Sequence, residues 1–84
     1  MQTATYDRLI RMPEVLDATG EKKSSYYQKM AAGLAPRTIK LSTHAAAVPM
    51  SEIRAFNAAR IRGAGEAELK ALVADLHARR VLAA

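Results

Sequence analysis

Residues 13–33 read PEVLDATGEKKSSYYQKMAAG, and this stretch predicts two short helices joined by a tight turn. Pro13 suits the first turn of a helix, where its missing N–H is not needed, and Glu14 complements the helix dipole there. Thr19-Gly20 ends the first helix, because glycine readily adopts the left-handed conformation of a helix C-terminus. The second helix runs from about Lys22 to Gly33, so the two together predict a helix-turn-helix.

The second helix combines an apolar face with a basic setting. Tyr26 and Met30 lie four residues apart, so they share a face that we expect to pack on Val15 and Leu16 of the first helix. Residues 22–51 contain no Asp or Glu but include five Lys or Arg side chains. This bias indicates binding to the phosphates of DNA. A solvated helix with lysines on its wet face would carry the same charge.

A small β-hairpin is predicted next. Residues 37–41 alternate polar and apolar side chains, with Ile39 and Leu41 inward, which is typical of a strand. Residues 42–44 form a polar turn, and residues 45–48, AAAV, return as a second strand although polyalanine is a poor strand former. A hairpin after a helix-turn-helix is the wing of a winged helix-turn-helix. The predicted fold class is therefore mainly α with a small β-hairpin.

The flanking segments complete this fold. Leu9 and Ile10 are expected to pack inward, either in a short strand or in a lead-in to the first helix. A third helix is expected from Ser51, as its N-cap, to about Arg62, with Phe56 as a core anchor. Residues 1–62 would thus form the winged helix-turn-helix domain.

Residues 63–84 are predicted to form a linker and a C-terminal amphipathic helix, from Glu66 to about Arg80. Its apolar stripe has the spacing i, i+3, i+4, i+7 and comprises Leu69, Leu72, Val73 and Leu76. The stripe could fold back as core, pair with another copy or an integrase, or lie on a membrane. The absence of aromatic residues from the stripe argues against a membrane.

Composition limits the possible functions. With 84 residues the chain is one small domain, and its net charge of +5 suits a polyanionic partner. There is no cysteine, and the two histidines lie far apart, which argues against a metal site or cofactor. No nucleophile–base pair or phosphate-binding glycine loop is apparent, so we expect no enzyme. The chain lacks a signal-like segment and an apolar run of about 20 residues, which predicts a cytoplasmic, nucleoid-associated protein.

Residues 7–15 read DRLIRMPEV and come directly before the helix-turn-helix turn, the hairpin and the third helix. This opening and the order of the parts resemble the AlpA family of phage and mobile-element regulators. The matching positions further along are Thr19-Gly20, Lys23-Ser24-Ser25-Tyr26-Tyr27, Gly33, Ala35-Pro36, Ile39-Lys40-Leu41 and Ser51-Glu52-Ile53. The resemblance spans about residues 6–60 and implies a MerR-like winged helix-turn-helix. Members act as excisionases, also called recombination directionality factors, or as transcription regulators.

The chain also departs from the family pattern. Glu21 stands where Leu is usual, Gln28 where Arg is usual, and Lys29 where an apolar residue is usual. The wing usually carries Arg near His44. The helix from residue 66 to residue 80 lies beyond the resemblance.

On the second helix, base edges are the expected targets of Ser24, Ser25 and Gln28, and glutamine can pair with adenine through two hydrogen bonds. Phosphates are the expected targets of the lysines, Lys22, Lys23 and Lys29. Lys23 could also reach a base edge. Ser24 or Ser25 could instead cap the helix. Tyr27 could donate to a phosphate or cover the edge of the core.

On the wing, Arg37 and Lys40 are expected to flank a tip formed by Thr43 and His44. Such a tip can enter a minor groove, whose negative potential favours cations. If His44 makes this contact, binding should strengthen at lower pH. A solvated loop histidine is the alternative.

The predicted partners are double-stranded DNA and other copies of the chain on DNA, and a tyrosine integrase is a further candidate. The leading hypothesis is an excisionase that binds cooperatively near an attachment site. Alternatives are a transcription regulator of integrase or transfer genes and, from another class, a protein-interaction adaptor that uses the stripe of residues 69–76.

Overall fold

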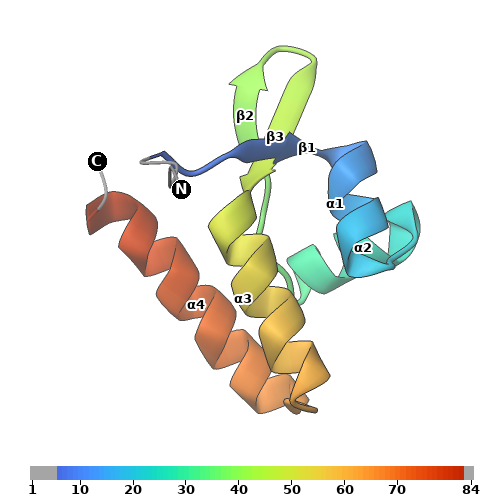
Figure 1. The fold of residues 1–84 in the computed structure, drawn as a ribbon, viewed down its shortest axis with the longest axis vertical. Coiled ribbons are helices and arrows are strands. Elements are labelled where there is room, and N and C mark those ends of the chain that lie inside the picture. Colours follow the sequence, from blue (N-terminus) through green and yellow to red (C-terminus); the bar gives the residue numbers. More distant parts are fainter. Residues whose placement is uncertain (1–5, 83–84) are drawn as a thin grey trace, which may run out of the picture.

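The computed structural model describes residues 6–82 and shows a winged helix-turn-helix with an additional C-terminal helix (Figure 1). The elements in chain order are β1 (Leu9–Arg11), α1 (Met12–Thr19), α2 (Lys23–Ala31), β2 (Ile39–Ser42), β3 (Ala45–Pro49), α3 (Met50–Ile61) and α4 (Glu66–Leu82). The predicted fold class, mainly α with a small β-hairpin, is confirmed.

The turn between α1 and α2 forms as predicted from Thr19-Gly20. Gly20 adopts φ 72°, in the left-handed region, and its N–H donates to the carbonyl of Leu16 at 2.9 Å. This closes α1 and reverses the chain within three residues, so that α2 can begin at Lys23.

The sheet has three antiparallel strands rather than the two of a simple hairpin, because residues 9–11 form a strand. Its order is β1-β3-β2, which places the alanine-rich β3 in the centre. Ala47 and Val48 are fully buried, and both α1 and α3 contact β3. Small side chains let these helices approach the sheet closely, so tertiary packing overrides the poor strand propensity of alanine.

Three predictions about flanking residues are wrong. Leu9 is 49% exposed, because strand side chains alternate and only Ile10 points inward. Leu41 is 42% exposed, since a register shift between Lys40 and Ser42 interrupts the alternation. Ser51 is not the N-cap of α3, which follows Pro49. Instead the Asp7 carboxylate accepts hydrogen bonds from both the N–H, at 3.0 Å, and the Oγ of Ser51.

The core lies where α1, α2 and α3 meet the sheet. Its fully buried members are Ile10, Val15, Tyr26, Ala35, Val48, Ile53 and Phe56, with Leu16 and Met30 packed against them. Phe56 is a core anchor as predicted, and its ring meets that of Tyr26 edge to face, at 6.4 Å between centroids. The Tyr26 hydroxyl donates to the carbonyl of Pro36 at 2.7 Å.

The last helix, α4, runs alongside α3, as Figure 1 shows. Val73 is 2% exposed and Leu69 packs against the core cluster, so the predicted apolar stripe folds back onto the protein. Near the other end of α4, Arg80 forms a two-bond ion pair with Glu52 at the start of α3, and its Nε lies 2.7 Å from Oε2. Within residues 6–82, no helix is long and apolar enough to cross a membrane.

The buried hydroxyl of Tyr26 yields a stability prediction. Burial and the nearby Glu52 carboxylate raise the pKa of Tyr26, so the hydroxyl stays protonated and able to donate. The substitution Tyr26→Phe removes this hydroxyl and leaves the buried carbonyl of Pro36 without its hydrogen bond from Tyr26. It should therefore lower the free energy of unfolding by about 1–3 kcal/mol, as measured in a urea titration.

The matched control is Tyr27→Phe, whose side chain is 40% exposed. It removes the same atom and should change the free energy of unfolding by no more than about 0.5 kcal/mol. Equal effects of the two substitutions would contradict a structural role for the Tyr26 hydroxyl.

Candidate nucleic-acid interface

The solvent-facing side of α2 presents the residues that the sequence predicted. Tyr26 anchors the opposite face in the core, which leaves Lys22, Lys23, Ser24 and Gln28 exposed and Ser25 half-buried. The N-cap of α2 is Lys22, so neither Ser24 nor Ser25 caps the helix. The hydroxyl of Ser24 and the amide of Gln28 are therefore available on the helix surface.

A shallow groove joins α2 to the wing. It has a volume of about 250 Å³ and is lined by Lys23 and Tyr27 of α2, His44 and its neighbours Ala45 and Ala46 in the wing, and Arg11, Met12 and Pro13. Thr43 and His44 form the predicted turn at the tip of the hairpin. The lining includes cationic and hydroxyl donors but no carboxylate, a combination suited to phosphate oxygens. Tyr27 borders this groove and is 40% exposed, so its contact with a phosphate stays a prediction.

The groove includes a residue that sequence reasoning missed. Arg11 is exposed at the junction of β1 and α1 and lines the groove together with Lys23 and His44. Strand alternation explains its position, because the buried Ile10 directs its neighbours outward once residues 9–11 pair with β3. The sequence leaves open whether these residues form a short strand or run directly into the first helix, so it assigns no role to the charge of Arg11.

Lys29 lies at the far side of α2 and is already paired. Its Nζ is 3.2 Å from Oε1 of Glu21, whose other oxygen accepts from Arg60 of α3 at 2.9 Å. The Glu21 side chain is only 9% exposed, and Arg60 also lies over the ring of Phe56 at 4.9 Å. A phosphate would have to compete with Glu21 for Lys29, so Lys29 is a weaker candidate than Lys23.

The structure does not bring Arg37 to the wing tip. Arg37 lies beside α4, where its N–H is 3.2 Å from Nε2 of His77 and its guanidinium is 3.1 Å from Nδ1. Its carbonyl accepts from Arg80 at 2.8 Å. Of the predicted wing residues, Lys40, Thr43 and His44 are exposed on the hairpin itself.

A comparison with protein families finds a match over more than half of the chain. The model of a family described as Prophage CP4-57 regulatory protein (AlpA) matches residues 8–61. The chain belongs to the AlpA family. The matched residues comprise the sheet, both helices of the helix-turn-helix and α3, whereas α4 lies outside them. No curated protein and no solved structure matches the chain.

The candidate interface on this AlpA-family fold thus has two parts, the exposed side of α2 and the tip of the wing, which the groove connects. The part of the chain that the structure describes holds no group of three or more His, Asp or Glu side chains that could bind a metal ion. The candidate interface supplies positive charge and hydrogen-bond donors, and these groups suit the binding of phosphate oxygens.

Removal of groove cations tests the interface. We expect Arg11→Ala and Lys23→Ala each to weaken binding to duplex DNA and to reduce the slope of log K against log salt by about one, the effect of one lost phosphate contact. Fluorescence anisotropy over a salt series measures both quantities.

The control is Lys70→Ala on α4, which removes the same charge from an exposed side chain outside the groove. Its salt slope should match that of the wild-type protein. If all three substitutions lowered the slope equally, binding would depend on net charge and not on the groove.

Proposed function

We propose that this AlpA-family protein is a sequence-specific, non-enzymatic DNA-binding protein of a mobile element that acts as an excisionase. In this proposal α2 lies in the major groove of double-stranded DNA and the hairpin of β2 and β3 lies along the flanking minor groove. The observation that carries the proposal is the groove between α2 and the wing, because it joins these two elements in one basic surface. Its lining includes Arg11, Lys23, Tyr27 and His44.

The residues divide into two kinds of contact. The exposed Ser24 and Gln28 can reach base edges, and a glutamine–adenine pair discriminates against other bases by about 1–3 kcal/mol. Lys22, Lys23 and Arg11 would contact phosphates and so fix the register of α2 without reading sequence. His44 at the wing tip would face the minor groove.

An excisionase would act by changing the shape of the DNA at the attachment site. A single domain of this size buries roughly 600–1,000 Å² on DNA, so strong binding needs several copies at repeated sites. Copies bound side by side could bend the DNA and arrange an attachment site for a tyrosine integrase, which would supply the strand cleavage. The protein itself would supply the geometry of the complex.

Regulation of transcription is the second candidate, because the matching family is described as a regulatory protein. Binding at a promoter uses the same contacts as binding at an attachment site. The adaptor hypothesis is less favoured, because it requires an exposed apolar stripe on α4, whereas Val73 is buried and Leu69 packs against the core.

A mobility-shift experiment tests the proposal. DNA from around the gene's own element is titrated with the protein over a salt series and compared with scrambled DNA. We expect stepwise, sequence-selective complexes that weaken steeply with salt. The Lys23→Ala/Gln28→Ala variant should lose the selectivity. Equal binding to scrambled DNA would contradict sequence-specific recognition.

The two functions are then separated in cells. An excision assay with the cognate integrase and a reporter driven by the integrase promoter are run in parallel with the same variants. Loss of excision without a change in the reporter supports the excisionase. A change in the reporter with normal excision supports the transcription regulator.

A further inference from the structure

The segment between α2, the proposed recognition helix, and the wing is held by side chains from other elements. Residues 32–38 connect α2 to β2. The carbonyl of Pro36 accepts from Tyr26 of α2, and the carbonyl of Arg37 accepts from Arg80 of α4. The N–H of Arg37 faces His77 of α4 at 3.2 Å. Two of the three contacts therefore come from α4.

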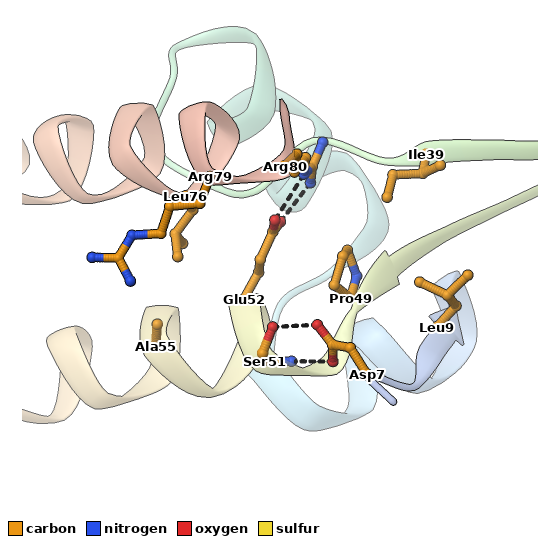
Figure 2. Close-up of a pocket in the computed structure, with 10 residues that line it drawn as sticks. All are labelled: Asp7, Leu9, Ile39, Pro49, Ser51, Glu52, Ala55, Leu76, Arg79 and Arg80. Atoms are coloured by element: carbon orange, nitrogen blue, oxygen red, sulfur yellow. Dashed lines mark hydrogen bonds and ion pairs between the residues drawn. The ribbon is translucent and has the colours of Figure 1, made fainter. Parts of the chain in front are cut away.

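Arg80 is itself fixed by a second contact. Its guanidinium binds both oxygens of Glu52, as the dashed lines in Figure 2 show, and the Glu52 side chain is only 6% exposed. A guanidinium bound through two parallel hydrogen bonds has little freedom to rotate. Arg80 therefore links the first turn of α3 to the carbonyl of Arg37 in one defined geometry.

The position of this link matters because β2 begins only two residues after Arg37, at Ile39. The backbone direction at Arg37 sets the direction in which the hairpin leaves the body of the protein. Since Tyr26 fixes the neighbouring Pro36 to α2, the segment determines how the hairpin is placed relative to α2.

We propose that α4 is a positioning element for DNA recognition, in which His77 and Arg80 hold the segment between α2 and β2 and so fix the angle between recognition helix and wing. The proposal rests on the function proposed above and extends it to residues that do not touch DNA. It assigns a role to the helix that lies outside the family-matched residues 8–61.

The contact with His77 also makes this positioning sensitive to pH. A neutral imidazole has one acceptor nitrogen, which can serve either the N–H or the guanidinium of Arg37, whereas a protonated one has none. Burial, together with the charges of Arg37 and Arg80, lowers the pKa of His77. Glu52, the acidic group that opposes this shift, is already bound by Arg80.

The sign of the effect follows from linkage. Because the docked state holds His77 with a lowered pKa, the undocked state binds more protons as the pH falls through the ordinary histidine range. Acidification therefore favours release of the segment. Wing-dependent DNA binding should therefore weaken as the pH falls.

The experiment uses the full chain and a DNA duplex containing its site. His77→Ala and Arg80→Lys are compared with Arg79→Ala, a control that removes an exposed cation from the same helix. We expect the first two to lower affinity by about tenfold, within the range of typical coupling between sites, and the control to change it less than twofold. Denaturant titration establishes that each variant is folded at the assay temperature.

Hydroxyl-radical footprinting supplies the readout that a loss of stability would not produce. In His77→Ala and Arg80→Lys, protection of the sugars along the flanking minor groove should disappear while protection of the backbone sugars beside the α2 site remains. His77→Gln, whose amide oxygen can accept from the Arg37 N–H, should restore the flanking protection and remove its pH dependence between pH 7.5 and 5.5. His44→Gln is the matched control for the other histidine.

The outcomes separate the two proposals. If the wild-type protein shows no sequence-selective binding, the proposed function is wrong. If the wild-type protein binds selectively but His77→Ala and Arg80→Lys leave affinity and footprint unchanged, the positioning role alone is overturned. It is also overturned if these variants lose both protected regions in equal proportion, because that result indicates a general loss of folded protein.

Discussion

The contact between Tyr26 and Phe56 determines where the rest of the molecule can lie. Both side chains are fully buried and meet edge to face. Tyr26 is the only fully buried side chain of α2, and the half-buried Met30 one turn later packs against the same core, so this pair sets the orientation of the helix. The same tyrosine reaches the carbonyl of Pro36, which connects the core to the start of the wing. Tyr26 thus helps to orient α2 and constrains the strand that follows it.

The local features of the fold could be predicted from the sequence because their causes are local. Gly20 predicts the turn between the helices because glycine adopts the left-handed conformation without help from distant residues. Helical periodicity alone predicts that Tyr26 lies in the core. The wing turn at Thr43 and His44 followed from polar residues between two apolar runs. These predictions used only neighbours within a few residues.

The remaining features depend on partners distant in sequence. Asp7 accepts hydrogen bonds from Ser51 at the start of α3, 44 positions along the chain. No sequence pattern near Ser51 indicates that this distant carboxylate binds the first turn of the helix. Alternation over residues 37–41 predicts Arg37 as part of a wing strand, yet β2 begins at Ile39, and His77 and Arg80 bind Arg37 from 40 and 43 positions away. For the candidate interface, exposure on α2 was predictable, whereas the participation of Arg11 depended on knowing that β1 joins the sheet.

The central position of β3 has a consequence for how the chain folds as it is synthesised. Residues 9–11 pair with residues 47–49, so β1 has no strand partner until β3 has left the ribosome. The helix-turn-helix segment is made earlier but lacks Phe56, the ring on which Tyr26 packs. A nascent or prematurely terminated chain would therefore hold the basic helix without its core, and partially made protein should not compete with the finished molecule for sites on DNA.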